Sequence, residues 1–562
     1  MSALRRWGAA VVAATLATLL VACGGLPTSG PVNAGQAIPD DTSNNDVVFI
    51  PDGPAKDATP EQIVQGFIAA GSGPTTNWAT ARLFLAPDLA DEWDPRETVT
   101  VYSPGERNLQ QVSDTQFMLS VAPVATVDSI GELTTGGASG DISLQYSLAQ
   151  QPDGQWRITQ APPGIVLDRN RFQQVFGKYL LQFFDPTWTY LVPDERWFPR
   201  LYAPTSIASA LVNGGPSPWL VDSVATAFVD GARLAQPSVP VRSGKAASVS
   251  LQEGARSLDA TALDRMQTQL FASLQQAGID EVDMYVDEQL LAANTVTTRQ
   301  TRVDGRPLVR TADAFGFVSG AAVESIPGLS DAILQVDAAD IEVDADRASS
   351  AVRDTLGAVW RVTADDTRTR LDARPGLIAP SIDPLGYVWS VPQASPSAVW
   401  AFAADGTRID VQNAWGGVSE IVDQRVSRDG TRIAAIVRDG GGYALWVAGI
   451  VRDRSGVPTG FGERRVLALL PAGGTALTWA DASTVSLITA EDGDPILLSQ
   501  EVGGFDETQG APTGITTAAG GTQSGGIRLR DAAGELYTPR GANWQHLASG
   551  VDVLAIQQGM PR

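Results

Sequence analysis

The sequence has almost no cysteine or histidine: Cys23 and His546 are single examples in 562 residues. A structural zinc site takes several nitrogen or sulfur ligands, so an ordinary zinc site is excluded. A lone cysteine forms no intramolecular disulfide, so hydrophobic cores and sheet pairing must stabilise the fold. We expect His546, beside Trp544, to be a packed or surface residue rather than a functional one.

Catalytic and nucleotide-binding signatures are missing as well. The chain contains no Gly-x-Ser-x-Gly or Ser-x-x-Lys motif, which removes two common types of serine hydrolase. It contains no P-loop and no Gly-x-Gly-x-x-Gly fingerprint. We therefore predict no catalytic residues, no cofactor and no metal site. Carboxylates are abundant, so a carboxylate-pair glycosidase or lyase stays open as an alternative.

Positive charge is scarce relative to negative charge. The chain has 40 lysines and arginines against 63 aspartates and glutamates, which gives a formal net charge of −23. Nucleic-acid binding needs basic surface to neutralise phosphates, and anionic membrane surfaces attract basic segments. The charge balance argues against both. The hydrophobic content of 43% is that of folded domains.

The apolar stretch near the start of the chain is too short to span a bilayer. Residues 7–21 are uncharged and rich in Ala, Val, Leu and Thr, whereas a spanning helix needs ~20 apolar residues. Arg5 and Arg6 precede this stretch, and small residues follow it. A basic start, a short apolar run and a small-residue cleavage site indicate a secretory signal.

The signal ends in Leu20-Val21-Ala22-Cys23, which resembles the cleavage site of bacterial lipoproteins. The resemblance implies cleavage between Ala22 and Cys23, an S-diacylglycerol group on the Cys23 thiol and an acyl group on its freed amine. Two or more acyl chains hold a protein stably on a membrane. We therefore expect the mature chain to be lipid-anchored on the outer, extracytoplasmic face of the cell membrane.

Composition divides the chain into five segments. Length alone favours three or four domains, at about 100–200 residues each. Residues 1–22 are the predicted signal peptide, and residues 23–58, rich in Gly, Pro, Ser, Asn and Asp, are a flexible tether. We predict a multi-domain fold: an α+β N-terminal domain over residues 59–177, a GerMN-like α/β module over 178–297 and an all-β propeller over 298–562.

Local patterns support the α+β prediction for the first domain. Thr59-Pro60-Glu61-Gln62 has the residues of a helix N-terminus with a capping box, and a second helix is predicted over 78–84. Strands are predicted at 99–102, 117–127, 142–148 and 156–158. The segment Gln151-Pro152-Asp153-Gly154 has the residues of a hairpin turn between the last two.

The segment from residue 172 to 202 is strongly aromatic. One hypothesis is a surface that stacks on sugars or peptides. We favour a strand core or domain interface, because aromatic side chains dominate such regions.

From about Tyr179 the chain resembles the GerMN domain of sporulation and germination proteins. The similarity includes Phe183-Phe184-Asp185, the helix end at Asn213-Gly214-Gly215, the apolar stripe of a helix closed by Gly278, and a strand alternating Val282, Met284 and Val286. Glu288 departs from the family, which turns on glycine there. The resemblance implies an envelope module without assigned catalysis.

The remainder of the chain has recurring strand–turn–strand motifs. Segments beginning at Ser381, Ser427, Leu477 and Ile527 repeat at roughly 46–51 residues, which is the range of propeller blades. The segment Ser427-Arg428-Asp429-Gly430-Thr431-Arg432 resembles the repeats of WD40-like periplasmic propellers. We expect five or six blades.

A cluster of acidic residues, Asp340, Glu342, Asp344 and Asp346, invites a calcium-site hypothesis. The glycine that an EF-hand loop needs is missing. Apolar residues alternate with the acids, so we favour one solvated face of a strand.

Taken together, the lipobox, tether, α+β domain, GerMN-like module and propeller resemble the LpqB lipoprotein family over essentially the whole chain. The resemblance implies a non-enzymatic accessory lipoprotein that binds the extracytoplasmic domain of a sensor histidine kinase in envelope and division control. The alternative is a lipoprotein that contacts the cell wall and binds or cleaves glycan, through the propeller mouth or the aromatic segment. A third expectation is delivery of an envelope component.

Overall fold

The computed structural model describes residues 50–135, 140–229, 232–320, 322–521 and 526–561. Ala22 and Cys23 lie outside these ranges, so the cleavage and lipid sites stay predictions from the sequence. Across the described residues, no helix combines the length and the apolar character needed to cross a membrane.

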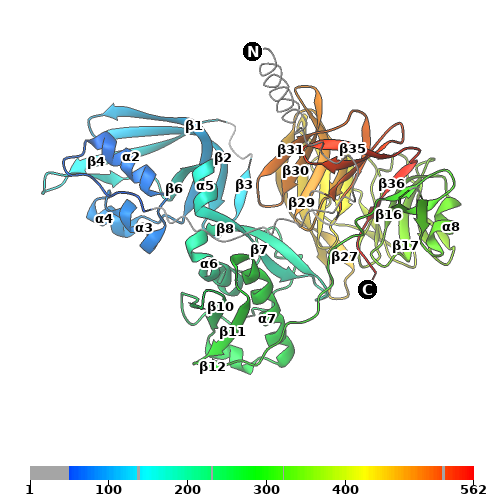
Figure 1. The fold of residues 1–562 in the computed structure, drawn as a ribbon, viewed down its shortest axis with the longest axis horizontal. Helices are drawn as coiled ribbons and strands as arrows, with labels where there is room; N and C mark the ends of the chain where they lie inside the picture. The colour runs from blue at the N-terminus through cyan, green and yellow to red at the C-terminus, as the bar shows by residue number, and fades with distance from the viewer. Residues whose placement is uncertain (1–49, 136–139, 230–231, 321, 522–525, 562) are drawn as a thin grey trace, which may run out of the picture. The chain divides into compact units, whose positions relative to one another are not determined.

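The first domain packs helices against a mixed sheet (blue to cyan in Figure 1), as predicted for an α+β domain. Its sheet has the order β5-β4-β2-β1-β6, with β3 paired to β2 and only β6 parallel to its neighbour β1. The helices are α2 (Pro60–Ala70), α3 (Thr75–Arg82), α4 (Pro87–Glu92) and α5 (Arg169–Val175). The strands are β1 (Thr98–Ser113), β2 (Gln116–Asp128), β3 (Leu133–Thr135), β4 (Ile142–Gln150), β5 (Trp156–Gln160) and β6 (Ile165–Asp168).

Local chemistry sets the ends of these elements. The hydroxyl of Thr59 accepts a hydrogen bond from the backbone N–H of Gln62, and the Gln62 side chain accepts from the N–H of Thr59 at 2.8 Å. The predicted capping box is confirmed. The turn before β5 is also confirmed, with Gly154 in the left-handed region at φ 79°. The predicted helix over 78–84 is partly wrong, because α3 starts at Thr75 and its first turn contains left-handed residues.

The second domain combines a long hairpin with a small sheet and one long helix. The hairpin is β7 (Phe176–Phe184) and β8 (Leu191–Pro199); α6 (Ala203–Ser209) and a π-helical turn (Ala210–Gly214) follow. The sheet has the order β12-β11-β10-β9. Its strands are β9 (Val241–Arg242), β10 (Ala246–Ser250), β11 (Glu281–Val286) and β12 (Gln289–Leu290), and the helix is α7 (Ala260–Leu274). Short 3-10 turns are Arg200–Tyr202, Glu253–Ser257 and Gln275–Ala277.

The predicted stripe of α7 is confirmed, since Met266, Leu270 and Leu274 are fully buried. Gly278, at φ 76°, ends this helical segment. The turn between β11 and β12 holds two non-glycine residues in the left-handed region, Asp287 at φ 47° and Glu288 at φ 64°. The departure from glycine at position 288 is therefore accommodated by a strained two-residue hairpin turn.

The aromatic segment is core, as favoured from the sequence. Most of its rings are buried, and they lie on α5, β7, β8 and the loop that joins the two strands. The buried members are Phe172, Phe176, Tyr179, Phe183, Phe184, Tyr190, Trp197 and Phe198. A stacking surface for sugars is not available on rings that contact each other inside the protein.

The third part is a propeller of six four-stranded blades within the described residues (green to red in Figure 1). Blade 1 is β13 (Leu308–Arg310), β14 (Phe315–Ser319) and β15 (Ala322–Ser325) with β36 (Val553–Gln557). Blade 2 is β16 (Ala338–Val343), β17 (Ser349–Asp354), β18 (Val359–Thr363) and β19 (Arg368–Asp372); α8 (Leu329–Leu334) precedes it.

The other four blades follow in chain order. Blade 3 is β20 (Ser381–Ile382), β21 (Val388–Ser390), β22 (Trp400–Phe402) and β23 (Arg408–Asp410). Blade 4 is β24 (Glu420–Val426), β25 (Arg432–Asp439), β26 (Gly442–Arg452) and β27 (Pro458–Leu470). Blade 5 is β28 (Thr475–Trp479), β29 (Thr484–Glu491), β30 (Asp494–Glu501) and β31 (Asp506–Gly510); blade 6 is β32 (Ile515–Ala519), β33 (Arg528–Asp531), β34 (Leu536–Arg540) and β35 (Asn543–Ala548).

The C-terminal strand closes the ring. β36 pairs antiparallel with β13, so the last strand of the chain is the inner strand of the first blade. It also pairs in parallel with β16, where Glu342 faces Ile556, and Figure 1 shows the red β36 beside the green β16. β36 is therefore paired on both sides, and the remaining blades have only the short, protected edges that are typical of propellers.

The structure corrects one step of the repeat alignment. The segments at Ser381, Ser427 and Leu477 enter the hairpin between the first and second strands of a blade. The segment at Ile527 enters the hairpin between the second and third strands of blade 6. The register was wrong because the same Asp-x-x-Gly turn occurs in both kinds of hairpin, as at Asp383 between the first two strands of blade 3 and at Asp531 between the second and third strands of blade 6.

Candidate binding site on the propeller axis

Aspartates at hairpin turns hold the blades in shape. In these turns one carboxylate oxygen accepts the backbone N–H groups two and four residues on, and the other accepts an aromatic donor six residues on. The arrangement occurs at Asp354 with Trp360, at Asp383 with Trp389 and at Asp531 with Tyr537. A buried carboxylate satisfied in this way fixes a tight turn without a disulfide.

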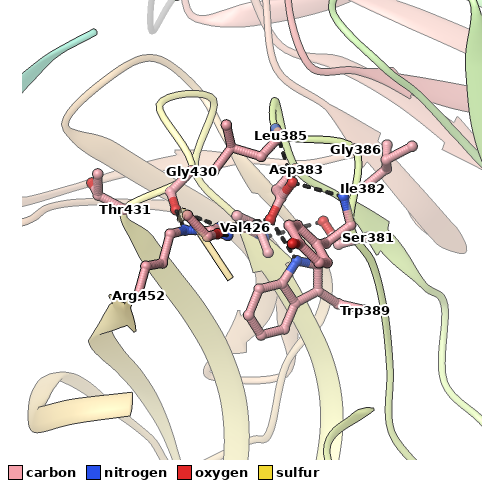
Figure 2. A network of polar contacts seen from close by, with 12 residues as sticks. Ser381, Ile382, Asp383, Leu385, Gly386, Trp389, Val426, Gly430, Thr431 and Arg452 are labelled. Carbon is pink, nitrogen blue, oxygen red and sulfur yellow. Dashed lines mark hydrogen bonds and ion pairs between the residues drawn. The ribbon is translucent and has the colours of Figure 1, made fainter. Parts of the chain in front are cut away.

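Asp383 also joins two blades (Figure 2). Its second oxygen accepts from Trp389 Nε1 at 3.0 Å and from Arg452 Nη2, on blade 4, at 2.5 Å. The Arg452 guanidinium donates further to the carbonyl oxygens of Gly430 and Gly456. The side chains of Asp383 and Arg452 are 0% and 1% exposed, so this ion pair is inside the protein. The aspartates of the repeat are therefore structural groups.

An open pocket lies where the inner strands converge on the propeller axis. It is a cavity of about 270 Å³ lined by inner strands of blades 2, 4, 5 and 6, by β17 and by residues flanking the first two strands of blade 3. The wall is aliphatic, and charged side chains come from blades 2 and 4. The lining residues include Leu377, Ile378, Val422, Ala476, Leu477 and Ala518 on the wall, and Asp340, Arg353, Asp423 and Arg425.

Two arginines are held rigidly around this pocket. Arg353 donates to Asp340 through Nε at 2.8 Å, and its Nη2 lies 2.6 Å from the same oxygen. Arg425 donates hydrogen bonds from Nε to the carbonyl oxygen of Leu477 and from Nη1 to the carbonyl oxygens of Ala379 and Pro380. It thereby ties blade 4 to blades 5 and 3 on either side.

Two carboxylates flank Arg425. Asp423 Oδ1 lies 3.2 Å from Arg425 Nη2, and Glu342 Oε2 lies 3.9 Å from Nη1. Neither oxygen accepts a hydrogen bond. Burial, with Asp340 nearby, raises the pKa of Asp423 to about 6 despite the opposing charge of Arg425. Burial also raises the pKa of Glu342.

Arg428, in the turn between β24 and β25, joins blade 4 to blades 5 and 6. Its guanidinium donates to the carbonyl of Gly521 at 2.8 Å and to that of Trp479 at 2.9 Å, which lie on blades 6 and 5. Burial lowers the pKa of Arg428 to about 10. Gln558, after β36, donates to Glu342 Oε1 at 2.5 Å and to the carbonyl of Val426.

The acidic cluster predicted on one solvated face is distributed over different environments, and that prediction is wrong for Glu342. Glu342 is 2% exposed and accepts hydrogen bonds from Ser381 and Ile382 of blade 3. Asp340 lines the axial pocket, Asp344 accepts the N–H of Ala348 in a turn, and Asp346 pairs with Arg299. In the described ranges no group of three or more potential ligands is placed to hold a metal ion.

The remaining sequence candidate, His546, lies on the surface as expected. Its Nε2 is 2.5 Å from Glu535 and its side chain is 50% exposed. The sequence did not single out Arg353, Asp423 or Arg425. A signal was available, because Asp423 and Arg425 are charged residues in a strand directly before the Ser427 repeat, between the apolar pair Ile421-Val422 and Val426.

Comparisons with known proteins cover each of the three domains. Residues 53–173 match the N-terminal domain of lipoprotein LpqB, residues 179–292 match the family described as sporulation and spore germination, and residues 308–554 match the lipoprotein LpqB beta-propeller domain. Similarity to the solved Swd1 beta-propeller domain of Myceliophteria thermophila is distant, at 11% identity and a TM-score of 0.26 over 37% of this chain and 70% of that one.

Curated relatives share these matches. The chain is 26% identical to Lipoprotein LpqB of Streptomyces coelicolor, and the alignment covers 97% of both chains. It is 29% identical to Lipoprotein LpqB of Rhodococcus opacus over 47% of this chain, and it spans 44% of the length of that relative. Since the two LpqB domains flank the germination-type domain in a single chain, the protein belongs to the LpqB lipoprotein family.

Proposed function

We propose that this protein is a non-enzymatic accessory lipoprotein, anchored through Cys23 on the outer face of the cell membrane, that binds envelope proteins. The main support is the combination of a lipobox with two LpqB domains and the sporulation and spore germination domain between them. The partner that we propose is the extracytoplasmic domain of a sensor histidine kinase. Binding there would modulate a two-component system in envelope and division control.

The axial pocket favours binding over catalysis. Its two carboxylates, Asp340 and Asp423, each face an arginine, and its lining residues include no histidine, serine or cysteine that could act as nucleophile or base. The lining also includes no aromatic ring. Sugar sites use such rings as stacking faces, so the structure offers no specific support for the alternative of glycan binding or cleavage.

The anchor is tested by replacing the lipid acceptor. In Cys23→Ser cells, we expect the chain to leave the lipid-extractable membrane fraction, and mass spectrometry of the native protein should find a lipidated Cys23 as the first residue. An unmodified Cys23 or an intact Met1 in the native protein would contradict the anchor.

The binding role is tested by crosslinking in intact cells. We expect the full chain to crosslink to the extracytoplasmic domain of a kinase, and deletion of residues 298–562 to remove that crosslink and alter kinase output. If the deletion leaves the crosslinked proteins and the output unchanged, the propeller is not the binding domain.

A further inference from the structure

The axial pocket is lined by a carboxylate, Asp423, that has an acceptor oxygen without a hydrogen bond. Asp423 is 8% exposed and lines the cavity, yet its Oδ1 accepts no hydrogen bond. The nearest cation, Arg425, directs its Nε and Nη1 donors to backbone carbonyls instead. Glu342 Oε2, on the other side of Arg425, is also without a donor. A buried acceptor without a donor costs about 1–3 kcal/mol. Asp423, the one of these two carboxylates that lines the cavity, is therefore suited to a ligand rich in donors.

The charged groups around Arg425 are not paired one to one. Asp340 is matched by Arg353, whereas Arg425 alone faces both Asp423 and Glu342. Each of these two acids therefore shares its nearest cation with the other. Burial is the largest cause of the raised pKa of both Asp423 and Glu342, because a buried carboxyl group loses the hydration that stabilises its charged form.

The wall limits what kind of cation fits. Leu377, Ile378 and Val422 line the cavity together with the charged residues, and Thr475 and Thr516 contribute hydroxyl groups to the lining. A hydrated metal ion would leave this aliphatic wall unused, and the described residues hold no metal-ligand cluster. An anion would meet Asp423 and Glu342. A primary ammonium on an alkyl stem supplies three donors, no acceptor and an apolar shaft.

We propose that the axial pocket binds a primary alkylammonium group, with the ammonium on Asp423 and the stem against the aliphatic wall. The cavity of about 270 Å³ is small, near the lower limit of ligand pockets, and accommodates one such group. The group can belong to a lysine side chain of another protein or to a free amine. The site is independent of whether the partner is a kinase.

The test is a titration of the mature chain with n-butylammonium, with n-butanol as the uncharged probe. We expect saturable binding of butylammonium and no binding of butanol. Asp423→Asn should weaken butylammonium binding by about tenfold or more, since it removes a charged hydrogen bond. Asp494→Asn, an exposed aspartate on β30, is the matched control and should leave binding unchanged.

A second variant covers the case in which Asp423→Asn disturbs folding. Thr517→Trp places bulk on the pocket lining from β32 and should abolish binding without removing a charge. Calorimetry of the wild-type chain at pH 6 in two buffers should show protons released on binding. Absence of saturable binding, or equal binding by wild type, Asp423→Asn and Thr517→Trp, would overturn the proposal.

Two further probes test whether the pocket recognises the alkyl stem as well as the ammonium. Nα-acetyl-lysine methylamide presents the side chain of a protein lysine, and glycinamide presents an amine without a long stem. Tighter binding of the lysine derivative than of glycinamide supports a site for an amine on an alkyl stem. Tighter binding of glycinamide would overturn the part of the proposal that assigns the wall to the stem.

Discussion

At the scale of single residues, buried ion pairs link separate parts of the chain, as disulfides do in many secreted proteins. The Asp383–Arg452 pair joins blades 3 and 4 and is completely buried. Removing one partner of a buried pair leaves an uncompensated charge in a low-dielectric interior. We therefore expect the loss of one partner to destabilise the contact between blades 3 and 4, although a well-packed apolar pair could replace the ion pair.

The first prediction concerns the Asp383–Arg452 ion pair. Arg452→Met should lower the free energy of unfolding of the propeller by about 3–5 kcal/mol, because Asp383 then stays buried and unpaired. Arg408→Met is the matched control, since Arg408 pairs with Asp410 on the surface, and it should cost less than about 1 kcal/mol. Tryptophan fluorescence in urea measures both. Equal losses in the two variants would show that burial of the pair is not decisive.

The second residue-scale feature is Glu195 on β8. It is 3% exposed, both of its carboxyl oxygens lack a hydrogen bond, and glycines 503 and 504 pack against it. Burial and the charge of Glu501 raise the pKa of Glu195 to about 8, against the effect of Lys178. Asp481 adds a further negative charge nearby.

The second prediction follows from this pKa. The folded state keeps the proton of Glu195 up to about pH 8, whereas the unfolded chain loses it near pH 4–5. Stability should therefore fall as pH rises through that window and level off above pH 8. Glu195→Gln should unfold at nearly the wild-type temperature at pH 5 and at a higher temperature at pH 8. A difference that does not change with pH would contradict the assignment.

At the scale of elements, closure by β36 is the feature on which the propeller depends. This strand supplies the inner strand of blade 1 and also pairs with β16 of blade 2. A chain ending before it leaves β13 without its inner neighbour and exposes a row of unpaired backbone groups.

The third prediction tests that closure. A chain truncated after Gly550 should lose cooperative unfolding of the propeller and become sensitive to limited proteolysis, because blade 1 is incomplete. A chain truncated after Met560 retains all of β36 and serves as the control. If the shorter chain resists protease as well as the control, the ring does not depend on β36.

At the scale of the whole molecule, the sequence was sufficient for the order and type of the domains. Local signals decide these features: the capping box at Thr59, the stripe of α7 and the alternation of β11 all occur as predicted. The axial pocket could not be predicted, because Arg353, Asp423 and Arg425 come together only when blades 2 and 4 close around one axis. Glu342 was misjudged for the same reason, since alternation along a strand does not show that its polar face points into a closed ring.

We propose that the protein is held on the membrane by its lipid and that its propeller binds the extracytoplasmic domain of a sensor histidine kinase. Family membership and the absence of catalytic signatures in the sequence support this claim.

The most direct measurement is the equilibrium affinity of the purified mature chain for the purified extracytoplasmic domain of that kinase, by interferometry. The account predicts saturable binding with Kd in the micromolar range or tighter, about −8 kcal/mol. It also predicts that the isolated kinase domain no longer binds a chain without residues 298–562. No binding at about 100 µM, or undiminished binding by the truncated chain, would contradict it.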